Sequence, residues 1–292
     1  MSDTTIQTFS NQLTDAYLSL RAKIRELWSA IDAAVPRPEI IFHYTSAEAL
    51  QSIVNNKMLW ASEALCMNDP TEGIHAGRVI ADRLRERHTD VPEHLIRLFS
   101  DEKVADVLNN QAFVVSFCAG GDLLNQWRAY GLDGRGYAIG FDAQRLLNGA
   151  TQEARLVPVS YEQAELEALL HAIIGFGVAE IARIKFCKDD FDRYWKLVGN
   201  YLLQSVIRFK NPAFREEREW RLVCFPSGNI SFRVARGRMV PYYEVRFSLE
   251  AIRVVRLGPK CGNRDGRVLN NYLKAACGPG MPLVENSLVP MA

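Results

Sequence analysis

Two glutamates, Glu217 and Glu219, stand two residues apart at the entrance to a strand-like run at 220–225, WRLVCF. On an extended backbone residues i and i+2 face the same way, so Glu217, Glu219 and Arg221 are expected to share one face. The alternate residues of the run are apolar and face the other way. Carboxylates at the root of a hydrophobic strand are costly unless they are solvated, paired or used in chemistry. These two acids are therefore the first candidates for catalysis.

The charges beside them have an ordinary explanation. Arg215, Glu216 and Arg218 are expected to form a solvated run on the surface. Glu219 differs because it enters the strand. A carboxylate pair can also share one proton, as in hydrolases that use two acids, so Glu217 and Glu219 allow that second chemistry.

A histidine, His43, stands near the end of an expected strand at 40–44. There its imidazole can bond a ribose hydroxyl or a carboxamide, with Tyr44 and Thr45 beside it. The alternative is structural: His43 is a satisfied, partly buried side chain, and Thr45 caps a helix at 46–56, with Glu48 completing a capping box.

Aromatic and basic side chains gather in the middle of the chain. Ser116 belongs to a buried-type strand at 112–118, and a short helix with Trp127, Arg128 and Tyr130 follows. Trp127 and Tyr130 are three residues apart and share one side of that helix. They can stack on a flat ring while Arg128 holds an anion, although core packing of the aromatics is the usual alternative.

A polar turn, NDPTEG at 68–73, contributes two more candidates, Asn68 and Asp69. Its plain interpretation is a turn in which Asp69 caps a following helix and Pro70 is the first helical residue.

The bulk properties exclude several classes. A net charge of +1 gives no strong global field toward nucleic acid or membrane. The N-terminus lacks the features of a signal peptide, and no apolar run is long enough to span a membrane. The six cysteines show no CxxC spacing, which favours free thiols in a reducing cytoplasm and no metal site. The phosphate-loop, HExxH and GxSxG signatures are absent from the sequence.

The pattern of periodicities predicts an α+β fold. Strands and helices do not alternate strictly, so we expect a mostly antiparallel sheet decorated by helices rather than a doubly wound parallel sheet. We expect a helical extension at 1–38, a core domain at 39–262, and a helix with a tail at 263–292. Within the core, the segments 72–110 and 162–209 are expected to be helical insertions.

Five segments in order resemble a bacterial family, domain of unknown function 2971. They are an H-Y-[TS] strand end, an L-W-x-S…N-D-P-x-E turn, an S-F-[CS] strand, a W-x-x-Y…G-x-x-I-G-F unit and an E-x-E-W-R strand. In this chain they fall at 43–45, 59–73, 116–118, 127–141 and 217–221.

That pattern in turn resembles the ADP-ribosyltransferase fold, with a histidine on the first strand and a glutamate on a late strand. The resemblance implies that Glu219, or Glu217, stabilises the positive charge that develops when the nicotinamide–ribose bond of NAD breaks. It implies that His43 holds a ribose or the nicotinamide amide, with a hydroxyl at Thr45. Tyr44 or Tyr130 would stack on nicotinamide, and Arg128 and Arg221 would bind the pyrophosphate.

The expected function is therefore an enzyme that consumes NAD as substrate and transfers ADP-ribose to a protein or nucleic acid, in the role of a toxin or phage-defence effector. The alternative is a non-catalytic module that binds nucleotides or nucleic acid through the basic segments 128–135 and 233–238. Neither reading expects a metal or a membrane.

Overall fold

The computed structural model describes residues 10–64, 71–86, 91, 93–99, 112–150, 154–184, 186–226, 229–235 and 237–290. Asn68 and Asp69 lie outside these ranges. The helices are α1 (Asn11–Ala34), α2 (Ala47–Asn56), α3 (Thr71–Arg85), α4 (Glu93–Leu98), α6 (Leu124–Ala129), α7 (Ala143–Gly149), α8 (Gln163–Arg183), α9 (Lys188–Val206) and α10 (Asn263–Cys277). The strands are β1 (Ile40–Thr45), β2 (Met58–Glu63), β3 (Phe113–Cys118), β4 (Tyr137–Asp142), β5 (Arg155–Pro158), β6 (Glu219–Cys224), β7 (Ser231–Ala235), β8 (Arg238–Arg246), β9 (Ile252–Leu257) and β10 (Leu283–Asn286).

The strands form one sheet whose main path runs β10-β9-β4-β1-β3-β2-β8-β7, with β6 and β5 added beside β3. Every pairing is antiparallel except β9 with β10. The fold class is therefore α+β with a mostly antiparallel sheet, as the sequence predicts.

Two strands, β1 and β2, pair with opposite ends of β3 along one of its edges. β1 meets this edge at a single pair, Phe42 with Cys118, while β2 meets its other end through Ser62 with Val114 and Glu63 with Phe113. On the opposite edge β6 pairs with β3 along its whole length. The residues of β3 between the two short pairings, at 115–117, therefore face a gap between β1 and β2. Backbone groups on such an edge need other partners, which makes the gap a natural place for a side chain or a ligand.

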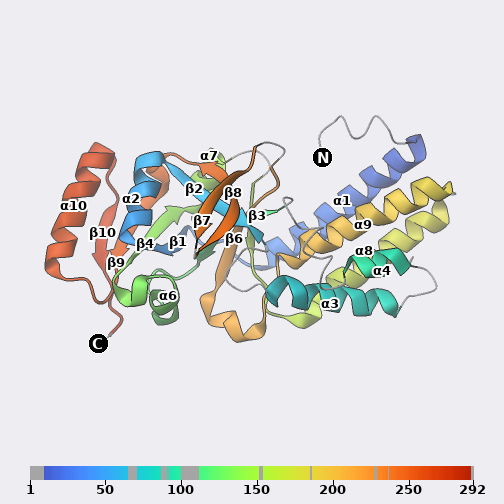
Figure 1. The fold of residues 1–292 in the computed structure, drawn as a ribbon, viewed down its shortest axis with the longest axis horizontal. Coiled ribbons are helices and arrows are strands. Elements are labelled where there is room, and N and C mark those ends of the chain that lie inside the picture. Colours follow the sequence, from blue (N-terminus) through green and yellow to red (C-terminus); the bar gives the residue numbers. More distant parts are fainter. Residues whose placement is uncertain are drawn as a thin grey trace.

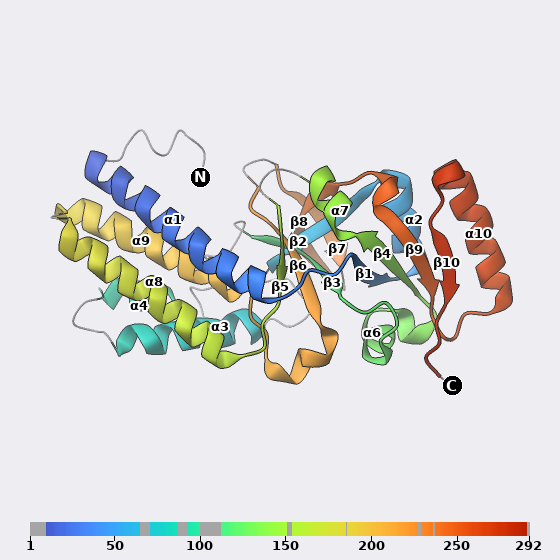
Figure 2. The ribbon, with the colours of Figure 1, turned by 180° about the vertical axis from the view of Figure 1, so that it is seen from behind.

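Helices pack at both ends of the sheet, as Figures 1 and 2 show. α2, α7 and α10 bury their apolar sides on one face of the sheet around Phe117, Phe141 and Leu222. At the other end, α1, α3, α4, α8 and α9 lie together and share a core of their own, built around Trp28 and Trp195. The predicted domain boundaries stay a prediction, although the helical segments do gather away from the sheet.

Periodicity located most elements to within a few residues, and the differences have local causes. Thr45 does not cap α2. It is the last residue of β1, and Ser46 is the cap because its side chain accepts from the backbone N–H of Ala49 at 3.2 Å. α7 and β10 were not predicted. Both are short, and β10 is stabilised by pairing with β9, a contact that local sequence does not encode.

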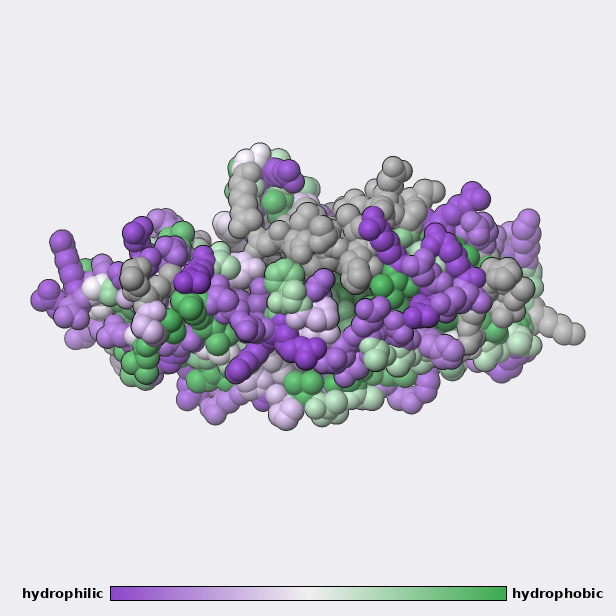
Figure 3. Space-filling model, turned by 90° about the horizontal axis from the view of Figure 1, so that it is seen from below, coloured by the Kyte–Doolittle hydropathy of each residue, from purple (hydrophilic) through white to green (hydrophobic). Residues whose placement is uncertain are grey.

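The outer surface is mixed. On the face drawn in Figure 3, hydrophilic residues lie along the whole length of the molecule, with separate hydrophobic groups interspersed among them. Among the described residues, no helix combines the length and the apolar character needed to cross a membrane.

Candidate functional site

Glu219 opens β6 and is buried, with only 4% of its surface exposed. The alternation of β6 explains its position. Trp220, Leu222 and Cys224 belong to the core on one face, so Glu219 and Arg221 turn to the other. Glu219 lies opposite Cys118 and Arg221 lies opposite Ser116, which brings the side chains of all four to one face of the sheet.

Both oxygens of the Glu219 carboxylate are fully engaged. Oε1 accepts from Ser116 Oγ at 2.7 Å and from Arg221 Nε at 2.8 Å. Oε2 accepts from Lys210 Nζ and from Arg221 Nη2, both at 3.1 Å. A carboxylate offers about four lone-pair positions, so these donors occupy the acceptor capacity of the group.

This arrangement holds the acid ionised. Burial alone would raise the pKa of Glu219, but the charges and hydrogen bonds of Arg221, with Lys210 and Ser116 acting in the same direction, lower it to about 2. Arg221 also donates through Nη1 to the carbonyl of Ile207 at 2.8 Å, just beyond the end of α9. The network therefore fixes the sheet to the helical end of the molecule.

Glu217 is not on the strand. It ends a short 3₁₀ helix at Pro212–Glu217, and Arg218 turns the chain with a left-handed backbone (φ 45°) before β6 begins. The expected sharing of a strand face between Glu217 and Glu219 was wrong for this reason. The two acids instead meet one ammonium, because Lys210 Nζ donates to Glu217 Oε2 at 2.8 Å as well. A shared proton is not needed when a cation lies between two carboxylates, so the paired-acid hydrolase is not supported.

His43 occupies the gap in the sheet. Its Nδ1 lies 3.0 Å from the backbone carbonyl oxygen of Ser116, and its ring packs edge-on to Phe117 with centroids 5.9 Å apart. Burial lowers the pKa of His43 below its ordinary 6.5. The hydrogen bond to Ser116 opposes this effect, while the positive charge of Arg233 adds to it. The ring is therefore neutral at pH 7, and because a carbonyl can only accept, Nδ1 carries the proton and Nε2 a lone pair.

The register puts His43 and Glu219 on opposite faces. Phe42 pairs with Cys118 and Cys118 with Glu219, so those three share a face and His43 points to the other. The predicted common hollow for both side chains is not formed directly. Ser116 links them instead, since its carbonyl meets the imidazole while its hydroxyl meets the carboxylate.

Tyr44 and Trp127 form a packed aromatic pair. Their rings meet edge-to-face with centroids 4.8 Å apart, and Trp127 is fully buried. Each polar end is satisfied: Tyr44 donates to the carbonyl of Gly120, and Trp127 Nε1 donates to Asp122 at 2.7 Å. Burial raises the pKa of Tyr44. In this conformation neither ring offers a face for stacking, so the core alternative describes them.

The other candidates are dispersed. Arg128 is exposed on α6, and Tyr130 follows the end of that helix in a non-helical conformation, so it does not share a helix side with Trp127 as expected. Thr45 is buried opposite Tyr137 on β4. Arg221 is committed to Glu219 and is not available for a pyrophosphate in this conformation.

Residues that the predicted site did not include lie on β2, β7 and β8, although the nucleotide-binding alternative named the segment 233–238 that contains Arg233. Arg233 of β7 stands over the ring of Trp60 on β2, with its guanidinium carbon 5.6 Å from the ring centroid, and donates to Ser62 Oγ at 2.8 Å. Trp60 also meets Tyr242 of β8, with ring centroids 4.8 Å apart. The L-W-x-S motif contained both Trp60 and Ser62 and was the available signal. Lys210 had no such signal, because its role depends on the turn that follows α9.

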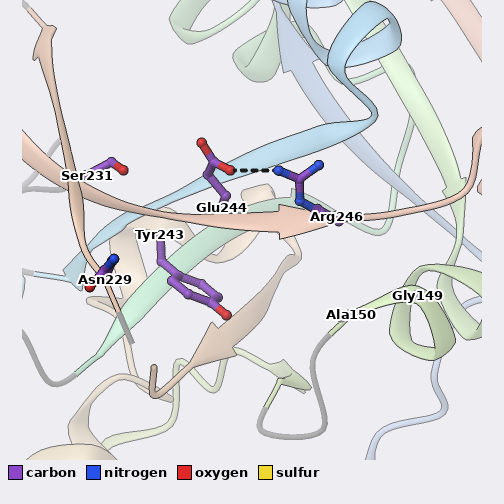
Figure 4. Close-up of a pocket in the computed structure, with 7 residues that line it drawn as sticks. All are labelled: Gly149, Ala150, Asn229, Ser231, Tyr243, Glu244 and Arg246. Atoms are coloured by element: carbon purple, nitrogen blue, oxygen red, sulfur yellow. Dashed lines mark hydrogen bonds and ion pairs between the residues drawn. The ribbon is translucent and has the colours of Figure 1, made fainter. Parts of the chain in front are cut away.

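A separate pocket of about 480 Å³ is lined by residues at the end of α7, at the start of β7 and on β8: Gly149, Ala150, Asn229, Ser231, Tyr243, Glu244 and Arg246. Figure 4 shows Glu244 and Arg246 side by side on β8 with their charged ends joined, at 3.3 Å. None of the predicted site residues lines this pocket. Within the described ranges no group of three His, Cys, Asp or Glu side chains is placed to hold a metal ion.

The resemblance of the sequence motifs to a known family can be compared with a family model. A family model described as a protein of unknown function, DUF2971, matches residues 126–222. This segment, which runs from α6 to β6, belongs to that family, as the motifs predicted. No curated protein and no solved structure matches the chain.

Proposed function

We propose that this protein cleaves the nicotinamide–ribose bond of NAD and transfers the ADP-ribose to a macromolecular acceptor. The observation that carries the proposal is the Glu219 carboxylate. It is buried, kept negative by two cations and oriented by Ser116, whose carbonyl also holds His43 at the gap in the sheet.

The chemistry needs a fixed negative charge rather than a proton donor. When the glycosidic bond breaks, its electron pair leaves with nicotinamide and positive charge develops on the ribose. A preorganised carboxylate in a water-poor site stabilises that charge and hydrogen-bonds a ribose hydroxyl. With its pKa lowered to about 2, Glu219 is charged across the neutral range.

Access to this acid requires one donor to move. Because the four contacts fill the carboxylate, a ribose hydroxyl must replace one of them. Lys210 is the contact best suited to yield, since its long side chain is flexible and Glu217 gives its ammonium a second partner at 2.8 Å. In this proposal Lys210 and Glu217 are positioning residues, and Glu219 is the group that meets the substrate.

His43 supplies the second half of the site. Its neutral ring presents Nε2 as an acceptor, while Nδ1 is held by Ser116. An acceptor in a gap between two strands can bond a ribose hydroxyl, as the resemblance implies. Ser116 then couples the two halves, because any shift of β3 moves both the carboxylate and the imidazole.

The test is release of nicotinamide. Purified protein is incubated with NAD, and free nicotinamide is measured by chromatography, with and without a bacterial lysate as acceptor. Wild type is expected to release it, and Glu219→Gln to reduce the rate at least about 100-fold. Glu180→Gln is the matched control, because Glu180 is also a buried acid paired with an arginine, Arg183, but lies in the helical end.

Folding must be separated from catalysis in this test. Glu219→Gln leaves two cations without their anion, so the melting temperature of each variant is measured. Ser116→Ala keeps both ion pairs and is expected to fold, yet to lose most of the activity because the carboxylate is no longer oriented. If wild type releases no nicotinamide, or if Ser116→Ala and Glu219→Gln release it at the wild-type rate, the proposal fails. Binding of NAD without release would favour the non-catalytic module.

A further inference from the structure

Arg233 is a half-buried cation to which the described residues offer no anion. In the described part of the chain no carboxylate forms an ion pair with it, and its Nε is buried with no hydrogen-bond partner. The hydrogen bond that it makes within the described ranges runs from Nη2 to Ser62, a neutral hydroxyl. Desolvation accordingly lowers the pKa of Arg233. A charge that is partly removed from water with no anion beside it is incompletely compensated, and titratable groups of this kind cluster at functional sites.

An exposed aromatic surface adjoins this cation. Trp60 is 40% exposed, although its indole contacts both Arg233 and the ring of Tyr242. A large exposed aromatic beside a guanidinium suits a flat ring that carries an anionic group. The ring can stack on the indole while the guanidinium forks onto the anion.

The location connects this surface to the gap in the sheet. Ser62 pairs with both Val114 and Tyr242, and Val114 lies two residues before Ser116 on β3. Alternation therefore puts Trp60, Ser62 and the Ser116 hydroxyl on one face, which is also the face of Glu219. Arg233 is close enough to His43 to disfavour protonation of its imidazole.

We infer that Arg233, Ser62 and Trp60 form a binding site for a phosphorylated nucleotide, in which Arg233 binds a phosphate and Trp60 stacks on the base. The hydrogen bond from Nη2 to Ser62 orients the guanidinium plane that binds the phosphate. Only the identification of that nucleotide as the ADP-ribose portion of NAD rests on the proposed function. The site does not use Arg221, which is committed to Glu219, or Arg128, which is exposed on α6. Arg233 belongs to the basic segment 233–238 that the nucleotide-binding alternative named.

The protein contains its own reporter for the test. Of its five tryptophans, Trp28, Trp127, Trp195 and Trp220 are at most 5% exposed, so Trp60 is the one that a bound base can contact. The probes are ADP-ribose, AMP, adenosine and inorganic pyrophosphate. ADP-ribose and AMP are expected to quench the tryptophan fluorescence, and Trp60→Phe to abolish the quenching. Calorimetry gives the dissociation constants.

Arg233→Gln is expected to raise the dissociation constant of ADP-ribose at least about tenfold and to leave that of adenosine unchanged, because adenosine carries no phosphate. Arg238→Gln is the matched control. It removes the same charge from the same hairpin but at an exposed position. Equal weakening by both variants would reduce the effect to a general field and overturn the site. Quenching that survives Trp60→Phe, or Arg233→Gln binding as tightly as wild type, would overturn it too.

The two proposals fail in different ways. If wild type releases no nicotinamide but ADP-ribose binding still depends on Arg233, the nucleotide site stands and the proposed cleavage falls. If wild type releases nicotinamide and Arg233→Gln does so with unchanged KM, the cleavage stands and the identification of the bound nucleotide as part of NAD falls; if Arg233→Gln also binds ADP-ribose as tightly as wild type, the Arg233 site falls as well. Glu219→Gln is expected to keep Arg233-dependent binding of ADP-ribose, provided that it folds.

Discussion

Two arginines on the same face of the sheet, the buried Arg221 and the half-buried Arg233, have opposite surroundings. Arg221 is 3% exposed, and its guanidinium is matched by the Glu219 carboxylate and the Ile207 carbonyl. Among the described residues, Arg233 has a serine hydroxyl and the face of an indole as its partners. A matched buried charge holds the structure together, whereas an unmatched one is stable only to the extent that its surroundings or a ligand compensate it. The comparison separates two parts of this face: the network in which Arg221 fixes the Glu219 carboxylate, and the surroundings of Arg233, for which we infer an anionic ligand.

The largest expected difference in stability is between the variants that remove the guanidinium of Arg221 and that of Arg233. Arg221→Met leaves Glu219 with only Lys210 as a charged partner in the buried network described above, and we expect a loss of about 3–5 kcal/mol in the free energy of unfolding. Arg233→Met removes a cation with which no carboxylate of the described residues forms an ion pair, so we expect a change within about 1 kcal/mol, of either sign.

Urea denaturation of both variants measures this difference. The matched chemistry of the two substitutions is the control, since each replaces one guanidinium by the same apolar side chain. Comparable losses in the two variants would mean that Arg233 is also part of the structural network, and the contrast would disappear.

Acidification is expected to destabilise the part of this face in which Glu219 pairs with Arg221. The pKa of Glu219 is depressed from 4.5 to about 2 in the folded protein, so its contribution to stability is fully present above pH 4.5 and is lost as the pH falls toward 2. The lowered pKa of His43 works in the same direction, with its contribution beginning to decline as the pH falls through 6.5. We expect the melting temperature to fall in two stages on acidification.

Variants assign the two stages. Ser116→Ala weakens the support of the Glu219 carboxylate and should shift the lower stage to higher pH, while His43→Gln should flatten the upper one. A melting temperature that is constant between pH 7 and 3 in wild type would contradict the folded-state pKa values on which this prediction depends.

Replacing Ser116 or Ser62 by alanine is expected to change the free energy of unfolding least. Ser116 donates to an ionised acid at 2.7 Å, and Ser62 accepts from Arg233 at 2.8 Å. A hydrogen bond to a charged group contributes about 1.5–3 kcal/mol. We expect Ser116→Ala to cost about that much, and Ser62→Ala to cost under about 1 kcal/mol because Arg233 is already incompletely satisfied. Thermal melts compare the two, and a larger loss for Ser62→Ala would reverse the assignment.

Several features were predictable because they are local. The alternation after Glu219 located β6 and its apolar face, and the spacing of apolar residues located α1 and the long pair α8 and α9. The cap of α2 was predicted one residue early because Thr45 and Ser46 both have hydroxyls suited to capping. Which of them caps depends on how far β4 extends the pairing of β1, and that is a tertiary contact.

The candidate site residues also divide into features that are local in the sequence and features that depend on tertiary contacts. The sequence by itself singled out Glu219, His43 and Ser116 by residue type and strand position, and it identified the family of the segment 126–222. Their relations depend on tertiary structure: Lys210 lies between two acids, His43 and Glu219 leave the sheet on opposite faces, and no described carboxylate pairs with Arg233. Strand parity fixes a side chain relative to its own strand, but the register between strands and the pairing of charges across the sheet depend on residues far apart in the chain.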